Sequence, residues 1–537
     1  MKLARSVCSF ASLLTIVVVG NLSLAQNAPA SQDRWQQMVD QACSGAQSPD
    51  REETCDKVRC DVARLRAQQL VTEADAGRAD AREMYARAAE AYLDIWRRHG
   101  DQRAQAGQRV VCQHLDEVLY NSGRAYVAAK LPSDAIRIWT LLASPSSGFA
   151  QSALTPRAVY EIGGIHQSLG DFDQAADAYE RFVRAFPNQQ QAPTALADSI
   201  VLRLALGQRD KAGADAELHA RNYGARPGSS TDEILLALAS WDVEHSRWKE
   251  AVTGLRAALP TIERHARVDL ALRAHTLLGR ALVHTGPRKD ASAQYASVVV
   301  RWRDPGLPQK LVQTFGGSGA ELRRLGSVLN AVGEALFFQA EEHRRREVES
   351  LAFPAYPFTP RAKGAKVSAQ DAARERDSWT LHTSTKVKEW LDKKLAAIEL
   401  AEREYKRIVE IQPAPPPKWV VAAAARVGWM WGDLYVALTR PRLPPGVVLD
   451  AERRAAYLAV ISTASAPIGA RATAAFEMCV ATSVRYQYAD RFSESCHAWL
   501  SWKDRTRHIP MDELAPRPNL DGNGLVPMRA LTEPALP

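Results

Sequence analysis

Residues 161–187 read EIGGIHQSLGDFDQAADAYERFVRAFP, and their pattern indicates how the chain folds. Apolar residues recur at helical spacing on both sides of the turn LGD at 169–171, which predicts two helices joined by a tight turn. Gly163 in the first helix is followed by a second small residue, Ala175, and then by Tyr179. Small residues on facing sides of two antiparallel helices let the backbones approach, and the tyrosine fills the gap beside them. The stretch therefore predicts a helical hairpin.

The same set of residues recurs along the chain. Gly123 and Trp139 stand in the same relation as Gly163 and Tyr179. The small residue of the second helix recurs at intervals of 40, 37, 39 and 40 residues, at Ala135, Ala175, Ala212, Ala251 and Ala291. One hairpin cannot bury both of its faces, so neighbouring hairpins must stack. This period predicts an all-α fold, a helical-hairpin solenoid followed by a C-terminal helical region.

The hairpin resembles the tetratricopeptide repeat. The small, small, aromatic and proline positions of that family are matched by Gly163, Ala175, Tyr179 and Pro187. Val159 and His166 depart from the family's preferences, and the intervals exceed its usual period of roughly 34 residues. The resemblance implies a scaffold that binds a protein or peptide on the concave face, which is lined by the first helix of each hairpin.

The first residues have the pattern of a secretory signal peptide. Lys2 and Arg5 form a basic start, Phe10–Val19 is an apolar run, and Ala25 closes a small-residue cleavage site. The apolar run is shorter than the roughly 20 residues of a membrane span. We therefore expect residues 1–25 to be removed. The predicted location is the periplasm, with an association with the outer membrane as one option, and no transmembrane segment is expected after cleavage.

Export changes how the cysteines are interpreted, because the compartment is oxidising. The chain has 7 Cys, and removal of Cys8 with the signal peptide leaves an even set: Cys43, Cys55, Cys60, Cys112, Cys479 and Cys496. Cys55 and Cys60 lie about 7.5 Å apart along one predicted helix, so they cannot bridge each other. We predict disulfides between Cys43 and Cys55, Cys60 and Cys112, and Cys479 and Cys496. The sequence has no CxxC and no paired Cys/His spacing of the zinc type.

The chain is expected to consist of several parts. They are a signal peptide (1–25), an N-terminal helical segment with cysteines (26–83), a repeat array (84–300), a helix-containing connector (301–380), a C-terminal helical repeat-like domain (381–503) and a disordered tail (504–537).

Within these parts, Ser318 is expected to cap a helix, and residues 383–413 read as one long helix. Further helices are expected around 451–462 and 468–502. The charge run HRRRE at 343–347 is interpreted as a solvated helix face.

No motif for catalysis, a cofactor or a metal is found. The sequence lacks HExxH and GxSxG, and disulfides would consume the candidate nucleophilic cysteines. We therefore expect a non-enzymatic protein without catalytic, cofactor-binding or metal-binding residues. The net charge of +8 falls to +6 when Lys2 and Arg5 leave with the signal peptide (8 − 2 = 6). This mild charge suits acidic partners or anionic envelope polymers and does not indicate nucleic acid.

The predicted partner-binding groove lies on the outward side of the first helices. Its residues are Tyr120, Arg124, Arg157, Tyr160, Gln167, Arg273, Arg280 and His284. Arginines spaced at i and i+7 share a helix face. Arginine mixed with tyrosine suits an acidic or carboxylate-bearing segment of a partner protein. A plain solvated surface is the competing interpretation.

The alternative function is an enzyme acting on peptidoglycan or glycan, or a glycan-binding module, in the tryptophan-rich C-terminal half. Trp419, Trp429 and Trp431 could form a carbohydrate platform, although at helical spacing beside an alanine run they are more typical of a core. A narrower resemblance covers residues 333–356, 386–435 and the Cys479/Cys496 region. They resemble large periplasmic tetratricopeptide proteins of myxobacteria, including ones of the gliding-motility envelope machinery. This resemblance implies a structural member of a multiprotein envelope complex.

Overall fold

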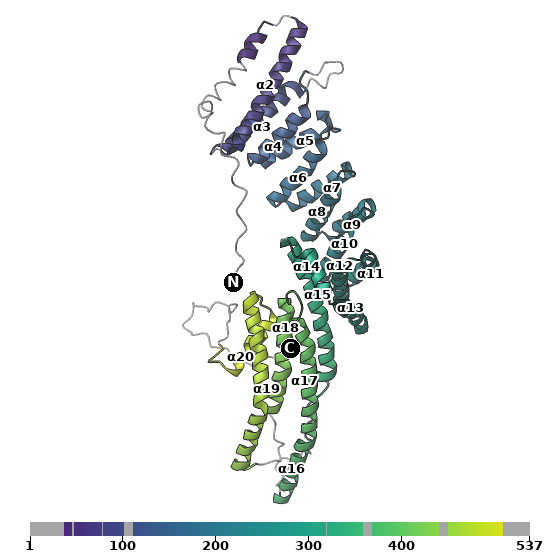
Figure 1. Cartoon of the computed structure of the whole chain (residues 1–537), viewed down its shortest axis with the longest axis vertical. Helices are drawn as coiled ribbons and strands as arrows, with labels where there is room; N and C mark the ends of the chain where they lie inside the picture. The colour runs from purple at the N-terminus through teal and green to yellow at the C-terminus, as the bar shows by residue number, and fades with distance from the viewer. Residues whose placement is uncertain are drawn as a thin grey trace. The chain divides into compact units, whose positions relative to one another are not determined.

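The computed structural model describes residues 37–45, 48–77, 79–100, 111–317, 319–357, 368–439 and 449–508. Every regular element in these ranges is a helix, as Figure 1 shows, so the predicted all-α class is confirmed. The chain divides into two compact units, one ending at Ile234 and one beginning at Leu235. The predicted signal peptide and Ser318 lie outside the described residues, as does nearly all of the predicted tail. The domain boundaries expected from the sequence stay predictions.

The first unit is a series of helices in which each packs against the next (Figure 1). After a short helix at residues 37–43 come α2 (Pro49–Asp75), α3 (Ala81–His99), α4 (Leu115–Ala128), α5 (Pro132–Ala143), α6 (Thr155–Leu169), α7 (Phe172–Ala185), α8 (Ala192–Ala205) and α9 (Arg209–Tyr223). The next helix, α10 (Thr231–Glu244), spans the boundary between the units. The predicted helical hairpins are therefore present as α4–α5, α6–α7 and α8–α9.

The small residues in the hairpins are where the helices meet. All five recurring alanines, from Ala135 to Ala291, are 0% exposed. A Cβ placed on Gly163 would lie 2.5 Å from the ring of Tyr179, and one on Gly123 would lie 2.2 Å from the ring of Trp139. Only glycine leaves room for the aromatic ring of the second helix at these two positions. The spacing between the glycine and the aromatic residue therefore reflects how the two helices of a hairpin pack.

Three disulfides join the cysteines of the described chain. They link Cys43 to Cys55, Cys60 to Cys112 and Cys479 to Cys496, with Cα–Cα distances of 5.7, 5.8 and 6.4 Å. These are the pairs expected from the sequence. The first two tie the N-terminal half of α2 to Cys43 before it and to Cys112 before α4, and the third staples α19 to α20.

The second unit continues with hairpins and then changes to longer helices. Its elements are α11 (Trp248–Arg264), α12 (Val268–Thr285), α13 (Arg288–Trp302), α14 (Leu307–Phe315), α15 (Gly319–His343), α16 (Ala369–His382), α17 (Lys388–Val409), α18 (Pro417–Thr439), α19 (Ala451–Tyr486) and α20 (Arg491–Lys503), with π-helical turns η3 (Arg344–Glu349) and η4 (Thr383–Val387). One large apolar core joins α12, α13 and α15 to α17–α20. None of the described helices has the length and apolar character needed to cross a membrane.

Two helix boundaries differ from the sequence-based expectation. Residues 451–462 and 468–502 are not separate helices, because α19 runs through Pro467 as far as Tyr486. A proline inside a helix costs about 3 kcal/mol, yet the turns beyond it are buried on one face, where Phe476 and Cys479 are fully inaccessible. This packing explains why the helix continues. The helix expected at 383–413 instead continues from α16 through the π-helical turn η4 into α17 and ends at Val409.

Leucine at a recurring alanine is expected to destabilise the fold. Ala175→Leu or Ala291→Leu adds volume where the side chain is completely enclosed, and overpacking a tight core costs about 1–3 kcal/mol. Ala293→Leu is the matched control, because Ala293 lies on the same helix as Ala291 but is exposed. Thermal unfolding followed by circular dichroism should show a lower melting temperature for the two buried variants only. Equal melting of Ala291→Leu and Ala293→Leu would mean that the repeat register is wrong.

Candidate partner-binding groove

The predicted groove residues of the first unit do not all face outward. Tyr120 is only 5% exposed, and its ring stacks on Trp139 with centroids 5.9 Å apart. Tyr160 is half-buried and packs against Tyr179 and Phe182. The prediction that Tyr120 lies on the outward side is therefore wrong, while that for Tyr160 stays a prediction. Their rings gain more from burial against neighbouring aromatic residues than from exposure.

The other three predicted residues of the first unit are exposed. Arg124, Arg157 and Gln167 all lie at the surface. The guanidinium of Arg157 lies 5.5 Å from the ring centre of Tyr120, and the hydroxyl of Tyr179 donates to Gln167 Oε1 at 2.9 Å. Both side chains are thus already held by tyrosines of the unit. Their role in binding a partner stays a prediction.

In the second unit, the predicted residues line two adjoining hollows. Arg280 and His284 line a hollow of about 690 Å³, and Arg273 and Arg280 line another of about 540 Å³. The two hollows share the residues Arg280, Glu334, Lys418, Trp419 and Tyr488. We call them the aromatic hollow and the polar hollow, and together they form the groove. Repeat helix α12 supplies one side of it and α18 another.

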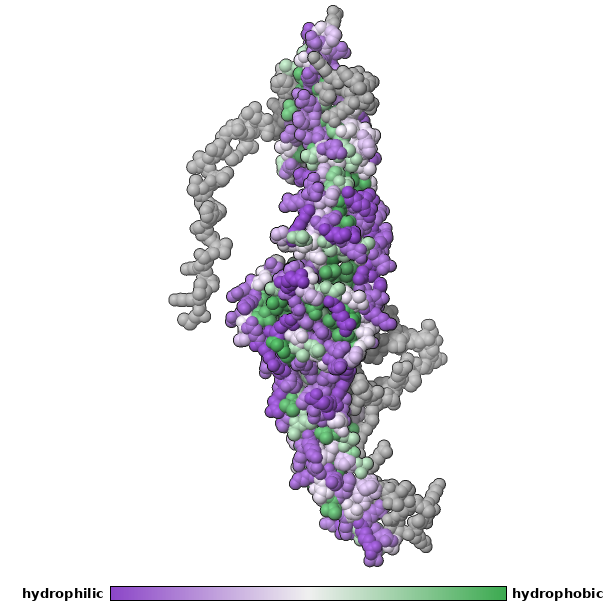
Figure 2. Space-filling model, turned by 90° about the vertical axis from the view of Figure 1, so that its right-hand side faces the viewer, coloured by the Kyte–Doolittle hydropathy of each residue, from purple (hydrophilic) through white to green (hydrophobic). Residues whose placement is uncertain are grey.

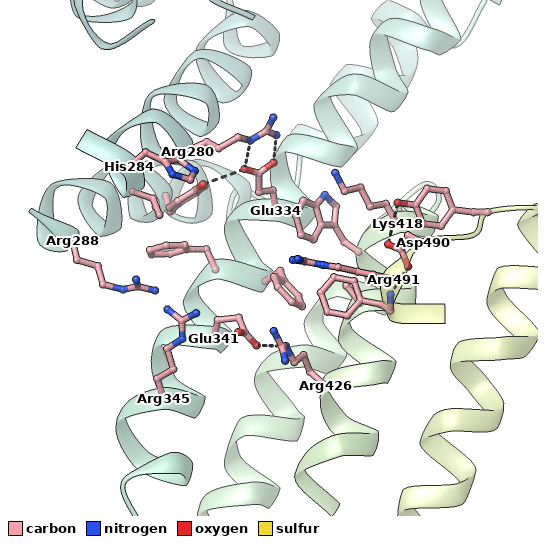
Figure 3. A pocket seen from close by; sticks show the side chains of 18 residues that line it. Arg280, His284, Arg288, Glu334, Glu341, Arg345, Lys418, Arg426, Asp490 and Arg491 are labelled. Carbon is pink, nitrogen blue, oxygen red and sulfur yellow. Dashed lines mark hydrogen bonds and ion pairs between the residues drawn. The ribbon is translucent and has the colours of Figure 1, made fainter. Parts of the chain in front are cut away.

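The aromatic hollow brings together residues from distant parts of the sequence (Figure 3). Besides α12, it is lined from α13, α15, the turn η3, α18 and the start of α20. Its aromatic wall consists of Tyr295, Phe337, Phe338, Trp419 and Phe492. Six cationic side chains, Arg280, Arg288, Arg345, Lys418, Arg426 and Arg491, face three carboxylates, Glu334, Glu341 and Asp490. The lining thus has an excess of positive charge.

Arg280 is occupied by an ion pair inside the unit. Its Nε donates to Glu334 Oε1 at 2.8 Å, and a second guanidinium nitrogen donates to the other oxygen. The Tyr295 hydroxyl also donates to Glu334 at 3.1 Å. The bond to Glu334 raises the pKa of Arg280, although burial opposes this. Arg280 therefore orients the lining, and reversing its charge would disturb the fold as well as the groove.

Glu341 is the centre of a buried ionic cluster at the floor of the hollow. Arg344 donates to both of its oxygens at 3.0 and 3.1 Å, the Tyr405 hydroxyl donates to Oε1, and Arg426 Nε lies 3.0 Å from the same oxygen. Burial lowers the pKa of Arg426, against the effect of Glu341. The interpretation of HRRRE as a solvated face is wrong for Arg344, whose side chain is 12% exposed. The buried acid on the preceding turn draws it inward.

Among the six cations that line the aromatic hollow, Lys418 and Arg491 are the two without an ion pair to a described acidic residue. Both are exposed, and neither forms an ion pair within the described part of the chain. Each lies over an aromatic ring instead, Lys418 at 4.9 Å from the centre of Trp419 and Arg491 at 5.2 Å from that of Phe492. Such cation–π contacts leave the hydrogen-bond donors of the cation free. These two residues are able to bind an anionic group.

Asp490 fixes the start of α20 and so the position of Arg491. Its Oδ1 accepts from the backbone N–H groups of Phe492 and Ser493, and the hydroxyl of Tyr488 donates to Oδ2 at 3.2 Å. This capping leaves the carboxylate engaged with the backbone. It explains why an acid so close in sequence does not neutralise Arg491.

The polar hollow has a different lining. Among its residues are Ser240, Thr276, Ser327, Asn330 and Gln487, all uncharged hydrogen-bonding side chains. His284, at the edge of the aromatic hollow, stacks on Trp248, with ring centres 4.1 Å apart.

The sequence did not predict Lys418, Arg426 or Arg491 as groove residues. No local pattern marks them, because they meet the repeat helices only in the folded chain.

The described chain also has a hollow of about 610 Å³ outside the groove, lined from α17, α18 and α19. Trp429 and Trp431 belong to the core, at 7% and 1% exposed, and only Trp419 of the three tryptophans lines the groove. No group of three potential metal ligands occurs within the described ranges. On the face in Figure 2, hydrophilic residues predominate and apolar ones form small separate patches. A partner on that face would meet a mainly polar surface.

Comparison with known proteins supports the repeat. Residues 157–188 match the family model described as tetratricopeptide repeat, which falls on the hairpin α6–α7. No curated protein matches the chain. The chain is thus an α-helical repeat protein that contains a tetratricopeptide repeat, as the residues of this hairpin predicted.

Several solved structures are similar over parts of the chain. The MamA RS-1 ArsTM double mutant is 18% identical, with 35% of this chain and 96% of that chain covered and a TM-score of 0.24. Naa15/Naa10 bound to HypK-THB is 13% identical, with 92% and 69% covered and a TM-score of 0.29. The human IFIT1 dimer with m7Gppp-AAAA is 10% identical, with 89% and 90% covered and a TM-score of 0.19.

Proposed function

We propose that the protein is a non-enzymatic interaction scaffold that binds an acidic segment of a protein partner in the groove of the second unit. The observation that carries this proposal is the pair of unpartnered cations, Lys418 and Arg491, beside an aromatic wall. Paired arginine and lysine donors suit carboxylates, and aromatic rings suit the apolar parts of a peptide. A tetratricopeptide repeat elsewhere in the chain is typical of such scaffolds.

The proposed setting is the periplasm of a bacterial envelope, within a multiprotein complex. It is supported by the signal-peptide pattern of residues 1–25 and by three disulfides, which persist in an oxidising compartment. The resemblance to myxobacterial envelope proteins makes a trans-envelope assembly the specific form of this proposal. The glycan-binding alternative is less well supported, because two of its three tryptophans are buried.

Reversal of both unpartnered cations is expected to abolish capture of the partner. The double variant Lys418→Glu/Arg491→Glu changes exposed side chains without ion pairs in the described chain. Its free energy of unfolding should therefore stay within about 1 kcal/mol of the wild-type value. Capture from envelope extract, followed by mass spectrometry, should lose the partner bound by the wild-type protein. That binding should also weaken between low and high salt, because exposed charges are screened.

Arg256→Glu is the matched control, since Arg256 is an exposed arginine of the same unit outside the groove. It should capture the partner normally. A sedimentation assay with purified cell wall tests the glycan alternative in parallel. Unchanged capture by the double variant would rule out the groove, and cosedimentation with cell wall without any protein partner would rule out the scaffold.

A further inference from the structure

The aromatic hollow has a cationic cluster at each of two places in its lining. In the first, Arg288 and Arg345 share one carboxylate, Glu342, which lies 2.6 Å from Arg288 and 3.9 Å from Arg345. Figure 3 shows the guanidinium groups of Arg288 and Arg345 near each other on one side of the hollow. Two guanidiniums facing one carboxylate leave one positive charge unbalanced. All three side chains are at least partly exposed, so an additional anion can reach them.

The second cluster contains Lys418 and Arg491. In Figure 3 both come from the side of the hollow opposite Arg288 and Arg345, and the side chain of Arg491 extends inward among the aromatic rings. The acid between them, Asp490, is engaged with the backbone of α20 and with Tyr488. This side of the hollow therefore has two cations and one carboxylate, and that carboxylate already accepts three hydrogen bonds. A second anionic group is needed to balance them.

Aromatic rings line the space between the clusters. Phe337 lies 5.2 Å from Trp419, and Phe338 stacks on Tyr295 at 4.2 Å, measured between ring centres. Phe492 completes the wall next to Arg491. A hollow of about 690 Å³ lies within the roughly 300–1,000 Å³ typical of ligand pockets. The order across it is cationic, aromatic, cationic.

The polar hollow indicates that the occupant is an extended chain. It continues from the aromatic hollow through Lys418, Trp419 and Tyr488, and it presents the amide of Gln487 and the amide oxygen of Asn330, whose Nδ2 donates to Gly326 O. A small anion in the aromatic hollow would not pair with these two groups. A peptide backbone has N–H and C=O groups at every residue that can pair with them.

We propose that the groove recognises an extended peptide with an aromatic side chain between two acidic residues at positions i−2 and i+2. In an extended chain, residues two apart point to the same side, about 6.6 Å apart. All three side chains then enter the aromatic hollow, the ring against the wall and one carboxylate at each cationic cluster. This specificity rests on the proposed function, because it names the segment of the partner that the scaffold binds.

Peptides of matched composition test the spacing. A fluorescein-labelled peptide with the core Glu-Ser-Phe-Ser-Glu should bind the full-length protein at least tenfold more tightly than one with Ser-Glu-Phe-Glu-Ser, in fluorescence anisotropy at fixed salt. Both carry the same residues and charge, but the second directs its acids away from the ring. Cores with both glutamates changed to glutamine, or with phenylalanine changed to alanine, should each bind at least tenfold more weakly than the first.

Protein variants assign the two clusters. Arg345→Ala and Arg491→Ala should each weaken binding of the Glu-Ser-Phe-Ser-Glu peptide several-fold, while Arg256→Ala should not. In each variant, changing one of the two glutamates to glutamine should have almost no further effect, and the silent glutamate should differ between the variants. Equal sensitivity to both glutamates in both variants would overturn the two-cluster assignment.

The remaining outcomes separate this inference from the proposed function. Equal affinity for the two glutamate patterns, or for the peptide without phenylalanine, would overturn the spacing and leave a general preference for acidic segments. Displacement of the peptide by polygalacturonate at equal carboxylate concentration would assign the groove to anionic glycan and overturn the inference. If no peptide binds, the inference fails. Partner capture by the wild type and its loss in Lys418→Glu/Arg491→Glu would still support the scaffold.

Discussion

Glu341→Leu is expected to destabilise the second unit by about 3–5 kcal/mol, the usual result of removing one partner from a buried ionic cluster. Glu341 is 6% exposed, accepts hydrogen bonds from Arg344 and Tyr405 and forms an ion pair with Arg426. Leucine of similar volume would leave two poorly solvated guanidiniums close together and a buried hydroxyl without its acceptor. Urea unfolding followed by circular dichroism should show the loss as a lower midpoint.

The neighbouring glutamate on the same helix is the control. Glu342 pairs with Arg288 and Arg345 at the surface, where its side chain is 30% exposed. Exposed ion pairs contribute about 0–1 kcal/mol, so Glu342→Leu should change the midpoint little. Similar midpoints for the two variants would mean that the cluster around Glu341 is solvated.

The same cluster predicts acid sensitivity. Burial alone would raise the pKa of Glu341, but hydrogen bonds from Arg344 and the charges of Arg426 and Arg344 outweigh it and lower that pKa below the ordinary 4.5. A depressed folded-state pKa gives stability that is fully present above the unfolded value and is lost as pH falls through the folded value. The difference in stability between wild type and Glu341→Leu should therefore shrink below pH 4.5.

Arg203→Met is expected to destabilise the first unit by a similar amount, about 3 kcal/mol or more. The Arg203 side chain is 1% exposed and bonds to Asp173 at 2.6 Å, to Asp177 and to Glu180, all on α7, and also to Gln208 at 2.8 Å. It therefore ties α8 to α7 and to the start of α9. Without it, three carboxylates on one helix repel one another. Calorimetry of the purified protein should show a lower melting transition.

Arg184→Met separates burial from charge. Arg184 also pairs with Glu180, at 3.0 Å, but its side chain is 65% exposed. This variant removes the same charge and should cost less than about 1 kcal/mol. High salt should rescue Arg203→Met only in part, because it screens the repulsion among the exposed carboxylates but restores no bond between α7 and α8. A loss no larger than that of Arg184→Met would show that Arg203 is not the link between the helices.

The hairpins could be predicted because the residues that pack their two helices together lie close to one another in the sequence. Gly163 and Tyr179 are in contact within one hairpin. Their contact therefore requires a fixed spacing in the sequence, and the same spacing recurs between Gly123 and Trp139. The orientation of single side chains was harder to predict. Tyr120 was expected to face outward and is buried, because Trp139 of the next helix stacks on it.

The candidate groove could be predicted only in part. Arg273, Arg280 and His284 do line it, since their helix face follows from the repeat register. The ion pair between Arg280 and Glu334 could not be predicted from the sequence. Glu334 lies on α15, and no local pattern connects it with Arg280. Lys418 and Arg491 lie on helices outside the repeat array and reach the groove only through the packing of α18 and α20.

The all-α class and the register of the hairpins follow from the amino-acid sequence because they depend on periodic patterns. The cysteine pairs follow from it because helix spacing keeps Cys55 and Cys60 from bridging each other. Which charges are neutralised and which remain free depends instead on the tertiary structure. Ion pairing depends on the distance between atoms and on burial, and both arise when distant helices pack. For that reason Arg203 and Arg344, which look like surface residues in the sequence, hold the fold together, while Lys418 and Arg491 remain available to a partner.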